Sequence, residues 1–197
     1  MISCIILSAG FSSRFGSPKS LAKINGETVI EHLQKSLLKT QVGEIIVVLG
    51  YEAEKIKPYL LNHTKVRFVY NKDYNLGQTS SFKVGLKAIS PEAEGVMLLP
   101  VDYPAIKKEM IDKLIKLFLD KKPVLLIPAF GGHKGHPPIF HSKLNKEILA
   151  LGDAVGLNTI AQGHQKDTVI LPVNDSGVVK SFNTLTEFEE IKKLLVL

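Results

Sequence analysis

Short apolar runs alternate along the chain with longer segments whose apolar residues recur every three or four positions. The apolar runs are continuous and rich in β-branched residues, a pattern typical of parallel strands covered on both faces. These predicted strands cover residues 2–7, 44–50, 65–70, 95–102 and 123–130. The periodic segments between them are predicted helices and cover residues 27–40, 53–62, 79–89 and 105–122. In the last helix, Ile106, Met110 and Leu114 share one face with Leu117 and Phe118.

Strands that alternate with helices predict right-handed βαβ units, and therefore an α/β fold with a Rossmann-like, doubly wound and mostly parallel sheet. We find no repeat, low-complexity stretch or linker, so we expect residues 1–197 to form a single domain. After residue 130 the pattern changes to the Gly-, His- and Pro-rich segment GGHKGHPPIFHS. We expect this segment to be an insertion over the carboxyl edge of the sheet, where open α/β sheets bind ligands. A strand at 167–173 and a helix at 184–197 follow.

Composition excludes several classes of protein. The single cysteine, Cys4, lies within the first strand, which rules out a disulfide framework and predicts a small core residue in a cytoplasmic protein. The apolar N-terminus is too short for a membrane segment and lacks the basic start of a signal peptide. The net charge is +6, but the lysines are scattered and lack stacking aromatics, so we expect no nucleic-acid partner. A positive field suits a polyanionic small substrate.

The loop after the first strand, LSAGFSSRFGSPKSLA, is the first candidate for chemistry. It holds Arg14, one of only two arginines in the chain, together with Gly10, Gly16 and Lys19. The spacing fits neither a Walker A loop nor a G-x-G-x-x-G fingerprint. A glycine loop with two cations can wrap around a triphosphate, since backbone N–H groups approach the anion while Arg and Lys neutralise it. A solvated surface turn is the alternative.

Two further segments allow a structural and a functional interpretation. Asp102 follows an apolar strand and is either a turn former beside Pro104 or a carboxylate ligand of Mg²⁺. In NLGQTSSFKVGL (75–86), Thr79 or Ser80 is a candidate helix N-cap. In the functional interpretation, Gly77 and Ser81 approach the base or ribose of a nucleotide.

The histidines do not form a convincing metal site. His133, His136 and His141 lie close in sequence, but Cys4 is distant and no carboxylate completes a zinc ligand set at the usual spacing. A Gly-His-Pro turn that shapes a pocket wall is the favoured interpretation. No G-x-S-x-G elbow supports a covalent hydrolase.

Taken in order, these motifs resemble one family. LSAGFSSRFGSPK is similar to the L-x-A-G-x-S-x-R-x-G-x-x-K signature of nucleotidyltransferases related to molybdenum cofactor biosynthesis. GQTSSFKVGL, PVDYP, KGHPPIF, LGDAVG and VKSFNTLTEFEEI follow in the order found in molybdenum cofactor cytidylyltransferases and in accessory proteins of xanthine-dehydrogenase-type enzymes. The resemblance covers about residues 2–192.

The resemblance implies a fold of the nucleotide-diphospho-sugar transferase type, CTP and molybdopterin as substrates, and Mg²⁺ as cofactor. It also implies a molybdenum hydroxylase as a possible partner. The implied catalytic residues are Arg14, Lys19 and Asp102, and the implied metal ligands are Asp102 and Asn183. The nucleotide-binding set is Leu7, Ser8, Ala9, Gly10, Ser12, Arg14, Lys19, Gly77, Ser80 and Ser81. The set at the pterin substrate is Gly135, His136, Pro137, Gly152 and Asp153.

The implied reaction is attack by the molybdopterin phosphate on the α-phosphorus of CTP, with pyrophosphate leaving. Positioning, Mg²⁺ and cationic side chains stabilise such a transition state. The chain departs from the family pattern at Asn183, where a second metal aspartate is usual. An amide keeps an oxygen ligand and loses the charge, so we expect weaker Mg²⁺ binding.

The base and the acceptor stay open. Ala9 favours the cytidylyl branch over guanylyltransferases, which more often have glycine there. A sugar-phosphate nucleotidylyltransferase shares the glycine loop but fits KGHPPIF less well. A non-catalytic carrier of molybdenum cofactor is consistent with the missing second aspartate, but it gives no reason to keep Arg14, Lys19 and Asp102 together.

Overall fold

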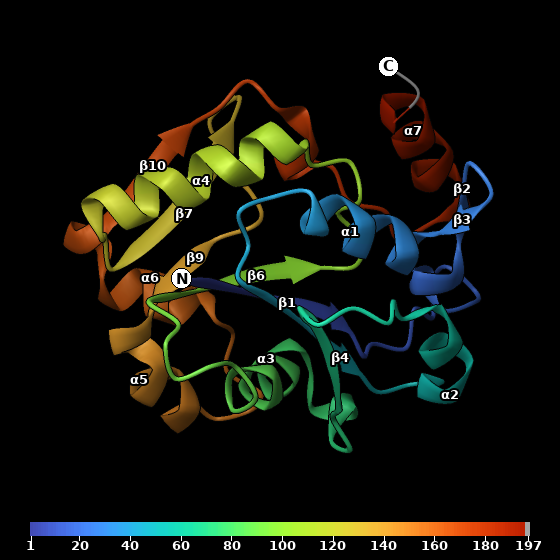
Figure 1. Cartoon of the computed structure of the whole chain (residues 1–197), viewed down its shortest axis with the longest axis horizontal. Coiled ribbons are helices and arrows are strands. Elements are labelled where there is room, and N and C mark those ends of the chain that lie inside the picture. The colour runs from blue at the N-terminus through green and yellow to red at the C-terminus, as the bar shows by residue number, and fades with distance from the viewer. Residues whose placement is uncertain (196–197) are drawn as a thin grey trace.

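Strand β1 (Ile2–Ser8) lies in the middle of the sheet and has a parallel neighbour on each side. It pairs with β4 (Glu44–Leu49) and with β6 (Gly95–Pro100). The computed structural model describes residues 1–195 and has the strand order β10-β7-β9-β6-β1-β4-β5 (Figure 1). The other parallel strands are β5 (Val66–Tyr70), β7 (Leu125–Phe130) and β10 (Thr168–Pro172). The predicted α/β class and mostly parallel sheet are confirmed.

Helices cover both faces of this sheet (Figure 1). One face packs against α1 (Val29–Leu38), α4 (Lys108–Lys121) and α7 (Leu185–Leu195). The other face packs against α3 (Gln78–Leu86), α5 (Asn145–Ala150) and α6 (Asn158–Gly163). A short α2 (Ala53–Ile56) buries Ile56 in the first layer. The arrangement is doubly wound, as expected.

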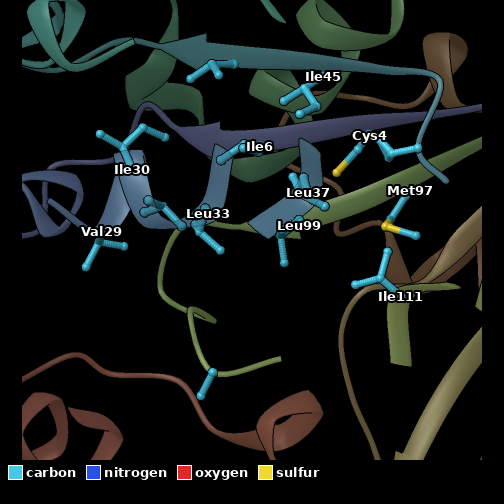
Figure 2. Packing of buried hydrophobic residues seen from close by; sticks show 14 of the residues in the cluster. Cys4, Ile6, Val29, Ile30, Leu33, Leu37, Ile45, Met97, Leu99 and Ile111 are labelled. Carbon is cyan, nitrogen blue, oxygen red and sulfur yellow. The ribbon is translucent and has the colours of Figure 1, made fainter. Parts of the chain in front are cut away.

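The two apolar layers divide the residues of β1 between them. Cys4 and Ile6 belong to the layer under α1 and α4, whereas Ile5 and Leu7 belong to the layer under α3. Figure 2 shows Cys4 and Ile6 in the first layer, with Leu33 and Leu37 of α1 in the same cluster. Burial raises the pKa of the Cys4 thiol far above its ordinary value, so this side chain is an inert core residue.

The segment after β7 differs from its prediction. It contains β8 (His133–Lys134) and β9 (Ile139–His141), and β9 enters the sheet as an antiparallel strand between β6 and β7. The expectation of an insertion lying over the sheet edge was therefore wrong for residues 139–141. The sequence did not predict this strand, because Pro137 and Pro138 precede it and its three residues are too few to show an alternation of apolar and polar positions.

Two helices also have ends that differ from their predicted ends. The predicted helix 53–62 ends early, because Pro58 removes a backbone donor and the chain continues as a 3₁₀ turn, Lys57–Tyr59. Helix α4 begins at Lys108, three residues later than predicted. The N–H of Lys107, the residue before the helix, donates a hydrogen bond to the Asp175 carboxylate. A two-stranded hairpin of β2 (Lys23–Ile24) and β3 (Glu27–Thr28) precedes α1.

The last two residues of the predicted closing helix lie outside the described residues. Within residues 1–195, no helix is long and apolar enough to cross a membrane.

The packing of α4 generates a stability prediction. Phe118 is fully buried, whereas Phe68 on the edge strand β5 is 40 % exposed. We expect Phe118→Ala to lower the free energy of unfolding by about 3–5 kcal/mol, because it removes a buried ring and leaves a cavity. Phe68→Ala should change it by less than about 1 kcal/mol. Urea unfolding followed by circular dichroism checks both values, and equal losses would contradict this description of the core.

Candidate active site

A cleft of about 420 Å³ opens at the carboxyl end of β1. Segments from distant parts of the chain form its wall: the loop after β1, the turn before α3, the residues after β6, and Asn183 before α7. Predicted residues that line it are Leu7, Ser8, Ala9, Gly10, Ser12, Arg14, Lys19, Gly77, Ser81, Asp102 and Asn183. Ligands of open α/β sheets bind at this edge.

The loop after β1 is held in a fixed turn. Ser12 has a φ of 52°, and its carbonyl accepts hydrogen bonds from the N–H groups of Phe15 and Gly16. Its hydroxyl oxygen accepts from the N–H of Lys19 at 3.2 Å. Gly16, with a φ of 82°, supplies the left-handed conformation that favours glycine. This turn brings Arg14 and Lys19 to the same cleft.

A charged cluster lies on the wall of the cleft. The Lys19 ammonium donates to Asp102 Oδ2 at 3.0 Å and to Asn183 Oδ1 at 3.0 Å. Arg14 donates to the same Asn183 oxygen at 3.0 Å. Asp102 lies in the turn after β6, and its side chain faces Lys19 of the first loop. Residues 169 positions apart in sequence meet here.

The start of α7 fixes the position of Asn183. Glu187 accepts hydrogen bonds from the N–H groups of Asn183 and Thr184, which lowers the pKa of its carboxyl group. The preceding Phe182 is fully buried and packs against Phe15 and Phe188, with ring centroids 5.2 Å and 4.7 Å away. This aromatic contact ties the first loop to the C-terminal helix, and it explains how the loop keeps Arg14 beside Asn183.

Helix α3 presents its first turn to the cleft. Its N-cap is Gly77, with a φ of 106°, so neither Thr79 nor Ser80 caps it. Asn71 donates to both the Ser80 and the Ser81 hydroxyl groups, at 2.9 Å and 3.0 Å. Ser81 lines the cleft, whereas the Ser80 hydroxyl donates to backbone carbonyls of the same turn. Ser80 therefore stabilises the turn before α3 through its hydrogen bonds and does not line the cleft.

A second cavity, of about 480 Å³, adjoins the cleft at Gln78, which lines both. Gly135 and His136 line this cavity, and its remaining polar lining is mostly amide side chains, those of Asn158, Gln162 and Gln165. Pro137, Gly152 and Asp153 are not among its lining residues. The Asp153 carboxylate instead pairs with Lys83 at 2.8 Å, and this contact anchors the loop before α6 to α3.

His136 places a buried imidazole on the wall of the second cavity. Burial lowers the pKa of its imidazole, against smaller opposing effects from a hydrogen bond at Leu98 and the charge of Asp102. Its ring centroid lies 4.5 Å from that of Tyr103, and its Nδ1 atom is buried without a hydrogen-bond partner among residues 1–195. Burial also raises the pKa of the Tyr103 hydroxyl. Both side chains are therefore neutral near pH 7.

The charged cluster offers two side-chain oxygen donors, from Asp102 and Asn183, to a hard divalent cation. In the described part of the chain no three His, Cys, Asp or Glu side chains gather as a metal site. Asp102 and Asn183 share one donor, Lys19, and so lie close enough to act together. Mg²⁺ is commonly held by one or two protein oxygens plus substrate phosphates and water. The two residues match that donor set.

The sequence pattern does not mark several residues that line the cleft, among them Phe11, Tyr74, Asn75 and Gln78. Tyr74 and Asn75 form a 3₁₀ turn after β5, and nothing in their local pattern distinguishes them from an ordinary surface turn. Tyr74 and Asn75 reach the cleft because β5, the strand before them, lies next to β4, which in turn lies next to β1 in the sheet.

Comparison with known proteins identifies the family. Residues 4–169 match the MobA-like NTP transferase domain. The chain belongs to the MobA-like NTP transferases. It is therefore a member of a nucleotidyltransferase family, in agreement with the resemblance found in its motifs.

The relatives of this chain carry names that point to different substrates. The chain is 29% identical to the molybdenum cofactor cytidylyltransferase of Escherichia coli K12 over 136 residues, 69% of this chain and 68% of the relative. It is 28% identical to a probable molybdenum cofactor guanylyltransferase of Bacillus anthracis, over 75% of this chain and 72% of the relative. It is 30% identical to a probable UDP-N-acetylglucosamine pyrophosphorylase of Acanthamoeba polyphaga mimivirus, over 67% of this chain and 52% of the relative.

Solved structures agree in fold. Rv0371c of Mycobacterium tuberculosis H37Rv superposes with a TM-score of 0.84 at 20% identity, over 98% of this chain and 97% of that one.

The buried imidazole predicts a pH dependence of stability. The folded pKa of His136 lies below its ordinary value of 6.5, so the unfolded chain binds the proton more readily. The free energy of unfolding should therefore fall as pH drops through about 6.5 toward the folded pKa. We expect His136→Gln to reduce this loss between about pH 7.5 and about pH 5.5, measured as urea midpoints. Identical pH profiles for both proteins would contradict the buried neutral state.

Proposed function

We propose that this protein transfers CMP from CTP to the terminal phosphate of molybdopterin and releases pyrophosphate. The observation that carries the proposal is the charged cluster of Arg14, Lys19, Asp102 and Asn183 in a cleft at the carboxyl edge of the sheet. Two cations beside one carboxylate suit an anionic ligand that brings its own divalent metal.

The proposed step balances without a general base. A phosphate monoester oxygen of the acceptor, already ionised near neutral pH, forms a bond to the α-phosphorus of CTP. The bond from that phosphorus to the oxygen bridging to the β-phosphorus breaks, and pyrophosphate leaves with the electron pair. Lys19 and Arg14 stabilise negative charge that shifts onto the leaving oxygens, and the loop after β1 fixes the triphosphate in line.

Asp102 and Asn183 are the residues that would hold Mg²⁺. When bound, the ion neutralises phosphate charge and polarises the phosphorus. Asp102 also orients Lys19 through their hydrogen bond, so the carboxylate positions a cation whether or not it contacts metal.

The cavity that meets the cleft at Gln78 is the proposed acceptor site. Amide groups on an apolar floor of Leu98, Ile127 and Phe140 suit a flat heterocycle with donors and acceptors at its edge. Ala9 and the Escherichia coli relative favour CTP. Within this proposal the product passes to a xanthine-dehydrogenase-type molybdenum hydroxylase.

A sugar-phosphate nucleotidylyltransferase is the second candidate, and the mimivirus relative favours it. In that case a sugar phosphate replaces molybdopterin in the same cavity, and the nucleotidyl transfer is unchanged. A non-catalytic carrier, the third possibility, would bind ligand without releasing pyrophosphate.

Pyrophosphate release tests the reaction. With Mg²⁺ and molybdopterin, we expect CTP to support release more strongly than GTP, UTP or ATP. Asp102→Ala should lower the rate at least about 100-fold, because it removes the metal carboxylate and frees Lys19. The matched control is Asp120→Ala, which removes an exposed carboxylate of α4 and should keep the rate. Release with a sugar phosphate and not with molybdopterin would establish the second candidate, and binding without release would establish the carrier.

Asn183 has a separate test. If its amide oxygen is a metal ligand, Asn183→Ala should raise the Mg²⁺ concentration for half-maximal rate by about tenfold, and Asn183→Asp should lower it. Asn62→Ala, at an exposed loop position, is the control. An unchanged Mg²⁺ dependence in Asn183→Ala would show that Asn183 only orients Arg14 and Lys19.

A further inference from the structure

Three aromatic side chains form a patch at the cleft and take no part in the charged cluster. This aromatic patch consists of Phe11 from the loop after β1, Tyr51 after β4, and Tyr74 after β5. The centroid of the Phe11 ring lies 5.3 Å from that of Tyr51 and 5.2 Å from that of Tyr74. Phe11 and Tyr74 both line the cleft.

The two phenylalanines of the first loop have opposite surroundings. Phe15 is 7% exposed and anchors the loop to Phe182 and Phe188, whereas Phe11 is 49% exposed. Half of the Phe11 side chain therefore contributes no buried contact to the fold. A flat apolar ligand in the cleft has access to that surface.

Backbone contacts hold the patch in place. A Cβ atom at Gly50 would lie 2.7 Å from the Tyr74 Cβ and 2.7 Å from the Ala9 carbonyl oxygen, so only glycine allows this approach. The Tyr51 N–H donates to the same Ala9 oxygen at 3.0 Å. These contacts tie Tyr51 and Tyr74 to the residues that precede Phe11.

The strand order separates Tyr74 of the patch from Asp102 of the charged cluster. Strands β6, β1, β4 and β5 are consecutive neighbours; Asp102 follows β6, and Tyr74 follows β5. Neighbouring strands lie about 4.8 Å apart, so these two strand ends are about 14 Å from each other. The cleft therefore has a charged end and an aromatic end, and the amide side chains of Asn75 and Gln78 line it as well.

We infer that the aromatic patch is the platform for the base of the bound nucleotide, with Phe11 as the ring that stacks on it. The inference rests on the proposed function: a triphosphate bound to Arg14 and Lys19 leaves the aromatic end of the cleft for the base. Aromatic stacking tolerates every base, so Phe11 strengthens binding in general. Selection among bases then falls to hydrogen-bonding groups such as Asn75 and Gln78.

Fluorescence gives a direct test, because the chain contains no tryptophan. In Phe11→Trp, CTP should quench the single indole, whereas inorganic tripolyphosphate, which has no base, should bind without quenching it. Phe68→Trp is the matched control, since Phe68 is also an exposed phenylalanine and lies on the edge strand β5. Its emission should respond to neither ligand.

Kinetics provide the second readout. Phe11→Ala should raise the KM for CTP about tenfold with kcat nearly unchanged, and it should leave tripolyphosphate affinity unaltered. Phe11→Tyr, which keeps an aromatic ring, should leave the KM for CTP near that of the unaltered chain. A merely structural role would lower kcat and weaken tripolyphosphate binding as well.

The outcomes separate the two proposals. CTP binding measured by calorimetry, without quenching of Trp in Phe11→Trp and without a KM effect in Phe11→Ala, would overturn the inference and leave the proposed function standing. Equal quenching by tripolyphosphate would also overturn it. If the unaltered chain binds no nucleoside triphosphate, the proposed function fails and the inference fails with it.

Discussion

The parallel pairing of β1 with both β4 and β6 determines where the helices and the candidate site lie. It buries every residue of β1 and forces helices onto both faces of the sheet. It also brings the carboxyl ends of these strands to one edge, with that of β5 beside them. The loop after β1 therefore lies between Asp102 on one side and the turn before α3 on the other. The candidate site is a consequence of this pairing.

The site is completed by a segment far away in sequence. Asn183 meets Arg14 and Lys19 because Phe182 and Phe188 pack against Phe15 of the first loop. Apolar packing thus positions a polar cluster, and the start of α7 supports it through Glu187. One amide oxygen of Asn183 accepts hydrogen bonds from both cations, so this side chain joins them without adding a negative charge.

Much of this was predictable from local pattern. The strands of β1, β4 and β6 are continuous apolar runs, and the glycine loop with its two cations was recognisable from residue type and order. The three-residue strand β9 was not, because its pairing with β6 and β7 is entirely non-local. For the same reason the sequence did not reveal Tyr74 and Gln78, whose place at the cleft depends on strand order. Asp153 was expected at the acceptor, but its contact with Lys83 depends on packing of a loop against α3.

In the proposed function, one cleft holds the triphosphate between the two cations and Asp102. A crystal structure of this chain with CTP and Mg²⁺ tests it most directly. We expect phosphate oxygens within hydrogen-bond distance of Arg14 and Lys19, with the metal on Asp102. A triphosphate bound elsewhere, with the contacts among Lys19, Asp102 and Asn183 unchanged, would contradict it.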